Sequence, residues 1–330
     1  MSKPDNLIDW QPGTTLSTLQ ARAQLLQRIR EFFARHDVLE VETPLLGSCF
    51  GTDPTIEPFE CRYPHIPYQP IRTLYLQSSP EFYMKRLLAD GSGPIFQVSK
   101  AFRNGEAGQR HNPEFSLLEW YRPGFSAQQL MEEVVDLMCY LLDKAQPVVE
   151  YHAYADLFAE QCQLDIFTVD VAALQAYAVE QQIPDADRLE WDKDAWLQLL
   201  MTECIEPRFR PNHLTFVTDY PASQAALAEL NPQDPSTAAR FELYYQGLEL
   251  ANGFQELTDA GQQAARCTAD NAVREQQGQQ TLPIDTAFLT ALQAGIPTCA
   301  GVAIGLDRVL MSALGLKDID QVQTFTLRRA

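Results

Sequence analysis

The chain has 330 residues, of which 45% are hydrophobic, and a net charge of -19, so it can bury a large core as one large or two ordinary domains. The acidic balance, without any cluster of Lys and Arg, argues against a large nucleic-acid surface. Seven scattered cysteines argue against disulfides or a zinc site and favour a reducing cytoplasm, and the sequence predicts neither a signal peptide nor a membrane span.

The N-terminal part of the chain is predicted to hold an arm, a helix and a short strand. Residues 1–13 are polar and contain two prolines, so we expect a flexible arm. Apolar residues recur at three- and four-residue spacing over 17–36, which predicts a helix with one apolar face. A strand over 38–41 follows, and Pro44 stops it because proline has no backbone donor.

A strand and a helix come next, after an irregular stretch over 47–72 to which the pattern assigns no element. Residues 74–77 predict the strand, and Ser79 begins a helix that ends at Gly91. Glu81 falls in the first turn of this helix. Its carboxylate interacts favourably with the helix dipole, which is sufficient to explain an acid at this position.

The stretch over 95–121, IFQVSKAFRNGEAGQRHNPEFSLLEWY, predicts a β-hairpin because its residues alternate with period two on either side of a polar connection over 104–113. A guanidinium can grip a carboxylate and a phosphate, an aromatic ring can stack on a base, and a carboxylate with a phenol can bind an amine. The alternative is a surface hairpin with a charged loop. The residues expected at one cleft are Arg103, Phe115, Glu119 and Tyr121, with Arg110 and His111 on the loop above.

Helical patterns over 126–161 and 170–209 predict scaffold, with breaks near Pro184 and Asp192. A strand over 214–217 follows, and the sequence after it predicts a proline turn and a helix. The last part of the chain is expected to form a polar helix and loop over 262–280 and then a short strand of small residues that runs into a helix.

A second hairpin is predicted in RFELYYQGLELANGFQEL, with a two-residue turn at 246–247. If Tyr245 pairs with Leu248, Glu242 and Glu249 lie diagonally on one face. Two convergent carboxylates are costly without a cation, and Mg²⁺ held by carboxylates and substrate phosphates would relieve that cost. Two exposed acids on a solvated face are the alternative.

Three stretches resemble the signature motifs of the class II aminoacyl-tRNA synthetases. FRNGEAGQRHNPEFSLLEWY resembles motif 2, and its RHNPEF and LEWY resemble the lysine-specific branch, although Gly105 stands where that branch has its acid. The first helix with its strand resembles motif 1, which builds a dimer interface, and TCAGVAIGLDRVLMSALG resembles motif 3. The resemblance implies an α/β (α+β) class II aminoacyl-tRNA synthetase catalytic fold, with an antiparallel sheet flanked by helices.

The resemblance also assigns site residues. Arg103 is implied to be the catalytic residue, and Mg²⁺ is implied to bind Glu242 and Glu249. The implied ATP-binding residues are Arg103, Glu106, Arg110, His111, Asn112, Phe115, Glu249 and Arg308. The implied amino-acid-binding residues are Ser79, Glu81, Glu119, Tyr121, Asn252, Glu256 and Ala303. Because strict alternation places Asn252 and Glu256 opposite to Glu249, we expect a bulge over 251–253.

The chain is expected to be a single catalytic domain over 1–330, without the anticodon-binding domain of lysyl-tRNA synthetases. It is similar to bacterial paralogues that modify a protein. Their activity implies activation of (R)-β-lysine or lysine by ATP and Mg²⁺ as an aminoacyl-adenylate, and transfer to a lysine of elongation factor P. A cytoplasmic homodimer acting on neither tRNA nor a membrane is implied. The alternatives are a truncated lysyl-tRNA synthetase, a small-molecule amide ligase and a non-enzymatic regulatory paralogue.

Overall fold

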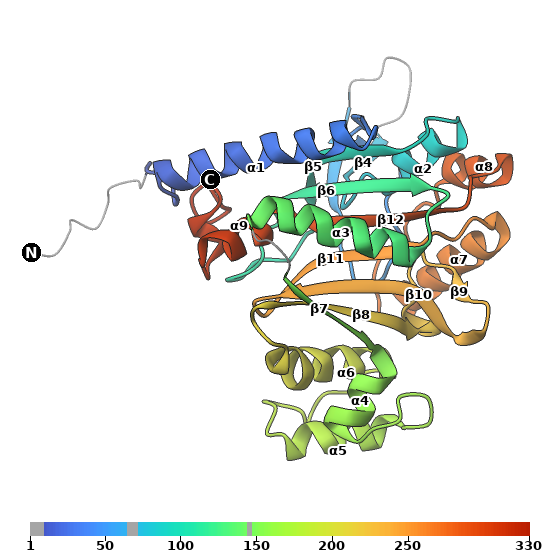
Figure 1. The fold of residues 1–330 in the computed structure, drawn as a ribbon. Helices are drawn as coiled ribbons and strands as arrows, with labels where there is room; N and C mark the ends of the chain where they lie inside the picture. The colour runs from blue at the N-terminus through green and yellow to red at the C-terminus, as the bar shows by residue number, and fades with distance from the viewer. Residues whose placement is uncertain (1–9, 65–71, 144–146) are drawn as a thin grey trace, which may run out of the picture.

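The computed structural model describes residues 10–64, 72–143 and 147–330, so most of the predicted N-terminal arm lies outside the described residues. The described residues form a nine-stranded sheet in the order β1-β5-β6-β12-β11-β10-β8-β7, with β9 paired to β10 (Figure 1). The pairs β1–β5 and β7–β8 are parallel, and the other pairs are antiparallel. The predicted fold class, a mainly antiparallel sheet flanked by helices, is therefore confirmed.

The elements have the following bounds. The large sheet contains β1 (Leu39–Glu40), β5 (Ile95–Phe102), β6 (Glu114–Pro123), β7 (Val148–Ala153), β8 (His213–Pro221), β9 (Leu230–Asn231), β10 (Asp234–Tyr245), β11 (Leu248–Gln255) and β12 (Cys299–Gly305). A small sheet contains β2 (Leu46–Gly47), β3 (Phe59–Tyr63) and β4 (Arg72–Leu76). The helices are α1 (Leu16–Arg35), α2 (Glu81–Ala89), α3 (Ala127–Leu142), α4 (Tyr154–Cys162), α5 (Val171–Glu180), α6 (Lys193–Leu200), α7 (Ala260–Gln276), α8 (Thr286–Ala294) and α9 (Leu306–Leu314).

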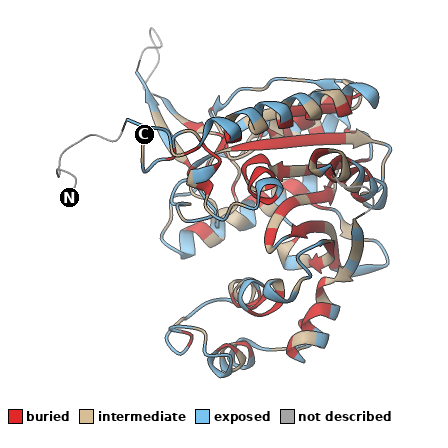
Figure 2. Ribbon diagram, turned by 60° about the vertical axis from the view of Figure 1, so that its left-hand side comes forward, coloured by how far each residue is buried: buried red, intermediate tan, exposed pale blue. Residues whose placement is uncertain are grey.

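Successive side chains of β5 and β6 alternate between the two faces of the sheet. Phe96 and Trp120 lie on the face covered by α1, α3 and α9, where the main hydrophobic core forms (Figure 2). Phe33 of α1 stacks on Phe96 with ring centroids 4.4 Å apart. Ile95 and Tyr121 lie on the other face and pack with α2 and α8. The residues predicted at the cleft share this second face, because their positions alternate with those of the core residues.

Helices α4, α5 and α6 form a lobe with a hydrophobic cluster of its own, below β7 and β8 in Figure 1. The prediction of helix over 126–161 is wrong in its middle, where β7 pairs in parallel with β8. Val148 and Val149 are β-branched residues, which favour a strand. The parallel partner that this strand needs begins at His213, far along the chain, so the local pattern did not reveal it.

The predicted helix after β8 is also absent. Residues 222–224 form one 3₁₀ turn, and β9 follows. Arg266 of α7 donates hydrogen bonds of 2.7 Å to the carbonyl oxygens of Ala226 and Ala228, and Leu230 pairs with Ala238 of β10. These partners lie outside the segment and hold it extended. Helix α8 was not predicted.

Arg22, in the predicted motif 1 helix, connects the three motif regions. Its guanidinium donates to Asp307 Oδ1 of α9 at 2.7 Å and to Ser116 Oγ of β6 at 2.6 Å. The backbone N–H of Ser116 donates to Asp307 Oδ2 at 2.8 Å. Because the Asp307 side chain is 4% exposed, its charge needs these partners. The network thus fixes α1, β6 and α9 against one another.

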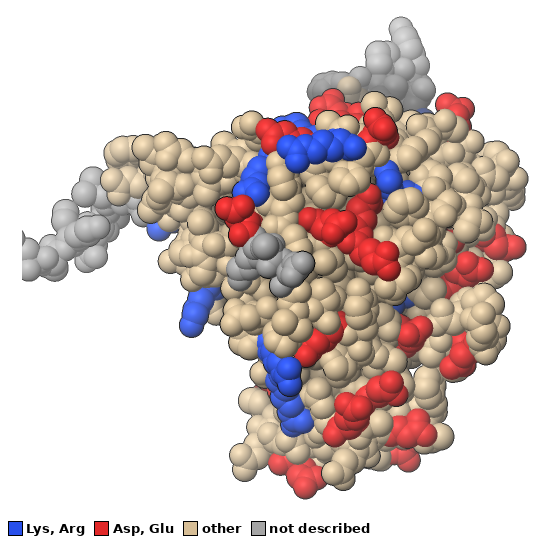
Figure 3. Space-filling view, viewed as in Figure 1, with Lys and Arg blue, Asp and Glu red and all other residues tan. Residues whose placement is uncertain are grey.

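Acidic side chains spread over the molecular face seen in Figure 3, including the α4–α6 lobe, in keeping with the net charge of -19. In the part of the chain that the structure describes, no helix has both the length and the apolar character needed to cross a membrane.

Candidate active site

The predicted β5–β6 hairpin is confirmed, with Gln97 opposite Glu119 and Ala101 opposite Phe115. Phe115, Glu119 and Tyr121 therefore lie on one face. The hairpin continues into β12, where Gly301 pairs with Tyr121 and Ala303 pairs with Glu119. The three central strands thus form the floor of one site.

Glu119 lies at the centre of a buried polar group. It accepts hydrogen bonds of 2.7 Å from the hydroxyl of Ser79 and from the phenol of Tyr121. Burial and the charge of Glu81 raise the pKa of Glu119 to about 8, although both hydrogen bonds act in the opposite direction. Burial and the neighbouring Glu119 raise the pKa of Tyr121 well above its ordinary value. The phenol is therefore a donor, and the Glu119 carboxyl would give up its proton when a cation binds beside it.

Lys85 of α2, which the sequence analysis did not single out, lies between two of the predicted substrate-binding acids. Its ammonium is 2.6 Å from Glu81 Oε1 and 2.5 Å from Glu256 Oε2. Burial lowers the pKa of Lys85, but the charges of Glu256 and Glu81 outweigh it, so the pKa is raised. Burial raises the pKa of Glu256 to about 7, against the opposing effect of Lys85. The four-residue spacing from Glu81 was the one available signal in the sequence.

Gly301 is one of the small residues of β12, and its surroundings leave no room for a larger side chain. A Cβ at this position would lie 2.3 Å from Glu256 Oε1 and 2.4 Å from the ring of Tyr121. Only glycine leaves room for both side chains to reach the site floor. Ala303, two residues on, lies between Glu119 of β6 and Asn252 of β11.

The β10–β11 hairpin turns at 246–247 as predicted, with Tyr245 paired to Leu248. A bulge is present, but it lies one residue before the predicted range: Tyr244 pairs with Glu249 and Leu243 with Ala251, so Leu250 is the additional residue. The bulge is therefore not at the glycine, and Gly253 has a packing role instead: a Cβ there would meet the ring of Phe241 at 2.3 Å.

As expected, the bulge turns Asn252 to the same face of the sheet as Glu249. Asn252 pairs with Glu242 and Glu249 pairs with Tyr244, so all of them lie on one face. Asn252 accepts a 3.2 Å hydrogen bond from Arg240, and Arg240 also donates to Glu242.

Glu206, at the end of the π-helical turn that follows α6, is an additional acid that sequence reasoning missed. Burial and the charges of Glu249 and Glu242 raise the pKa of Glu206 to about 7. Glu242 pairs with Arg240 and Glu249 pairs with Arg308, and Glu206 adds a third carboxyl beside them, so the group offers oxygen ligands that a divalent cation could bind at Glu242 and Glu249. Among the described residues, no group of three His, Cys, Asp or Glu side chains could hold a metal by itself. This arrangement suits Mg²⁺, which takes few protein ligands and shares substrate phosphates.

The catalytic candidate Arg103 follows β5 directly. Its guanidinium lies 5.3 Å from the ring centroid of Phe115 and 3.6 Å from Glu106. The Nε of Arg103 is buried and has no hydrogen-bond partner in the ranges that the structure describes. A buried donor of this kind fits an anionic oxygen from a ligand. Gly105, the departure from the lysine branch, has a positive φ of 83°, which glycine adopts at low cost.

A cationic group lies beside the metal-binding candidates. Arg308 of α9 donates to Glu249 Oε2 at 3.1 Å and lies 2.6 Å from His111 Nε2. Burial and the charge of Arg308 lower the pKa of His111, so the imidazole is neutral. Arg110 donates to the Gly247 carbonyl at 2.9 Å. The structure thus brings His111, Arg110, Arg308 and Glu249 together, as the sequence analysis expected.

Asn112 differs from the other predicted ATP-binding residues because its amide binds backbone. It donates to the Glu114 carbonyl at 2.6 Å and accepts from the Leu327 N–H at 3.0 Å. Asn112 also lines a cavity of about 360 Å³ beside the C-terminal residues. That cavity contains none of the acids described above, so it is separate from the candidate active site.

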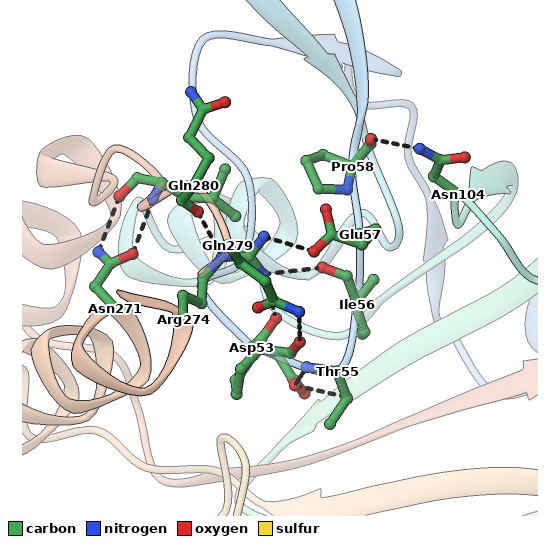
Figure 4. A network of polar contacts seen from close by, with 12 residues as sticks. Asp53, Thr55, Ile56, Glu57, Pro58, Asn104, Asn271, Arg274, Gln279 and Gln280 are labelled. Atoms are coloured by element: carbon green, nitrogen blue, oxygen red, sulfur yellow. Dashed lines mark hydrogen bonds and ion pairs between the residues drawn. The ribbon is translucent and has the colours of Figure 1, made fainter. Parts of the chain in front are cut away.

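Arg274 of α7 organises the loop before β3 (Figure 4). Its guanidinium donates to the carbonyl oxygens of Asp53 and Ile56 at 3.1 and 3.3 Å and pairs with Glu57 at 3.0 Å. Asn104 donates its N–H to the Glu57 carbonyl at 3.0 Å. The network therefore supports the chain immediately after Arg103, although Arg274 is distant in the sequence.

The comparisons with known proteins agree with this geometry. Residues 5–329 match the family model described as tRNA synthetases class II (D, K and N). Proteins named "Elongation factor P--(R)-beta-lysine ligase" from two Klebsiella pneumoniae strains and from Salmonella paratyphi B are each 44% identical over 321 residues. The aligned region covers 97% of this chain and 98% of each relative.

Proposed function

This chain belongs to the family of class II tRNA synthetases (D, K and N), and we propose that it is an ATP-dependent ligase that attaches (R)-β-lysine or lysine to a lysine side chain of elongation factor P. The relatives of 44% identity carry the name of that activity over almost their full length. Within the structure, one observation supports it above all others. Three carboxylates, those of Glu81, Glu119 and Glu256, gather beside Lys85 and Tyr121 and provide a site for a substrate with ammonium groups.

The proposed amino-acid site lies between this acidic group and Arg103. Glu119, Tyr121 and Glu256 bind the side-chain ammonium of the substrate, and Ser79 and Glu81 lie near its second amino group. Asn252 and Ala303 line the region of the substrate carboxylate. Arg103 holds the carboxylate and the α-phosphate of ATP together, which its planar set of donors permits. This placement brings the two reacting groups into contact.

The proposed ATP site lies over the β6 and β11 side of the sheet. The base stacks between Phe115 and Arg308, Glu106 contacts it, and Arg110 and His111 bind the terminal phosphates; Asn112 supports the loop from behind. The substrate carboxylate attacks the α-phosphorus and pyrophosphate leaves, which gives an aminoacyl-adenylate. The acceptor lysine then attacks the carbonyl carbon and AMP leaves. Mg²⁺ held by Glu242 and Glu249 would neutralise phosphate charge when bound.

The proposed quaternary state is a homodimer formed through α1 and the edge of the sheet. β1 is the edge strand, and Leu39 in it is 57% exposed. Leu45 and Leu46 add further exposed apolar surface on the adjoining segment. A row of exposed leucines next to an unpaired edge favours burial against a second copy. A cytoplasmic location is proposed as well, since each of the seven cysteines is a thiol rather than half of a disulfide.

The test is mass spectrometry of elongation factor P after incubation with this protein, ATP, Mg²⁺ and either lysine or (R)-β-lysine. We expect one acceptor lysine to gain the mass of the amino acid less one water. Arg103→Ala serves as the inactive control. Unmodified elongation factor P in every reaction would overturn the proposal.

A parallel reaction with tRNA in place of elongation factor P separates the proposed activity from that of a truncated lysyl-tRNA synthetase. The net charge of -19 disfavours binding of the phosphate backbone, so we expect little aminoacyl-tRNA at physiological salt. Efficient charging of tRNA would favour the synthetase function instead.

A further inference from the structure

Lys85 is almost completely buried and contacts two carboxylates. Its side chain is 1% exposed and that of Glu256 is 1% exposed, whereas the side chain of Glu81 is 16% exposed. Lys85 contacts Oε1 of Glu81 and Oε2 of Glu256, which leaves the second oxygen of each carboxylate for another donor. The ammonium of Lys85 is therefore enclosed by the protein, and Glu81 is the more exposed of its two partners.

The charged and titratable groups that surround this lysine come from four elements. Glu81 shares helix α2 with it, Glu119 and Tyr121 are on β6, Glu256 follows β11, and Cys299 begins β12. All of the charged partners in this set are acids. A buried carboxylate without a cation takes up a proton instead of staying charged, so the ammonium of Lys85 favours the charged form of Glu256, against burial, which raises its pKa to about 7.

The carboxylates of the pocket outnumber its cationic groups. Glu81, Glu119 and Glu256 carry three negative charges when ionised, and Lys85 supplies one positive charge, which leaves two to be balanced. We propose that Lys85 is a specificity-determining residue of this pocket: it neutralises one carboxylate charge, so that the pocket accepts a substrate with two ammonium groups. This inference rests on the proposed function, since it concerns the amino acid that the ligase activates.

The alternative is that Lys85 only holds α2 in place. Two features argue for a role in binding. Lys85 bridges two acids that lie on different elements, and Gly301 leaves space for Glu256 to reach the floor of the site. If the ion pair served packing alone, hydrophobic residues of similar volume would serve equally well.

The test compares Lys85→Met with Lys317→Met, which removes an exposed lysine outside the site, in ATP–pyrophosphate exchange driven by lysine or (R)-β-lysine. Loss of a charged hydrogen-bonding partner costs roughly a 10- to 100-fold change in affinity. We expect Lys85→Met to raise the KM for either amino acid by about that factor, with the KM for ATP unchanged. The exchange rate of the Lys85→Met variant should also recover at higher pH, where the carboxyl groups of the pocket lose their protons. Equal changes in both KM values without a shift in the pH profile would overturn the inference.

A double variant distinguishes an effect of the pocket's net charge from an effect of packing. Glu81→Gln alone leaves one net negative charge, whereas Lys85→Met combined with Glu81→Gln restores two. We therefore expect the double variant to bind lysine better than either single variant. If its KM for lysine exceeds both single values, Lys85 does not act through the charge of the pocket.

Unfolding by denaturant gives a readout that does not depend on activity. Without Lys85, the pKa of Glu256, which burial already raises to about 7, rises further above its unfolded value, so folding stability is lost over a wider range as pH increases. The difference in midpoint between Lys85→Met and Lys317→Met should grow from pH 5 to pH 9. If the wild type shows no exchange with either amino acid, the proposed function fails, and this difference alone decides the role of Lys85: a constant difference would overturn it.

Discussion

The hydroxyl of Ser79 donates a 2.7 Å hydrogen bond to Glu119 Oε2 and accepts the N–H of Glu81 at 3.0 Å. Ser79 thus links the two acids that would bind the amino groups of the substrate. We expect Ser79→Ala to raise the KM for lysine about 5- to 30-fold, because a hydrogen bond to a charged group contributes about 1 to 2 kcal/mol. Pyrophosphate exchange at varied lysine concentration measures this effect.

The matched control is Ser236→Ala, which removes an exposed hydroxyl outside the site. It should leave both KM values unchanged. A Ser79→Ala enzyme with an unchanged KM for lysine would show that this hydroxyl is dispensable for binding.

Ala303 lies between Glu119 and Asn252 on the floor of the proposed amino-acid site. We expect Ala303→Gly to shift preference from (R)-β-lysine toward α-lysine, because the methyl narrows the space near the α-carbon. A change of one methyl group is worth about 1 to 3 kcal/mol of discrimination. The ratio of kcat/KM for the two isomers, measured in wild type and variant, gives the result. An unchanged ratio would mean that the methyl of Ala303 only packs.

Norleucine has the shape of lysine without its side-chain ammonium. A site built to hydrogen-bond a charged group rejects an analogue that lacks it by roughly 10⁴-fold or more. If Glu119, Tyr121 and Glu256 bind that ammonium, norleucine should fail to drive pyrophosphate exchange. Exchange as efficient as that with lysine would contradict this assignment.

Binding of the amino acid should release protons near pH 7. The pKa of Glu119 is about 8 in the ligand-free protein, so this carboxyl holds a proton there, and an ammonium nearby would lower its pKa and expel it. Affinity should therefore increase as pH rises toward 8. Calorimetry in buffers of different ionisation enthalpy counts the released protons. Glu119→Gln should abolish the release, and proton uptake by the wild type would contradict the mechanism.

Arg274→Met should lower the free energy of unfolding by about 2 to 4 kcal/mol, since it leaves the part-buried carbonyl oxygens of Asp53, Ile56 and Gln280 without their donor. The exposed partner Glu57, at 46% exposure, adds little to this loss. Urea denaturation measures the effect. Arg188→Met is the control, because Arg188 is 78% exposed and should change stability by less than about 0.5 kcal/mol. Equal stability of the two variants would contradict the role of Arg274.

The elements that carry a periodic pattern of their own could be predicted from the residues alone. The apolar stripe of α1, the alternation of β5 and β6, and the turn between β10 and β11 depend on neighbours close in the chain, and each was predicted. The fold class followed from the resemblance to the synthetase motifs. The same local signals placed Glu119 and Tyr121 on one face of the first hairpin, and Glu242 with Glu249 on one face of the second.

The features that depend on a distant partner could not be predicted and became apparent only in the folded chain. β7 is a strand because β8 lies beside it, and the bulge at Leu250 follows from how β11 pairs with β10. Lys85 shows the same limit most clearly. Its neighbour Glu81 is four residues away, but Glu256 is brought to it by the sheet. A buried charge is defined by what surrounds it in space, and sequence spacing records only the neighbours along the chain.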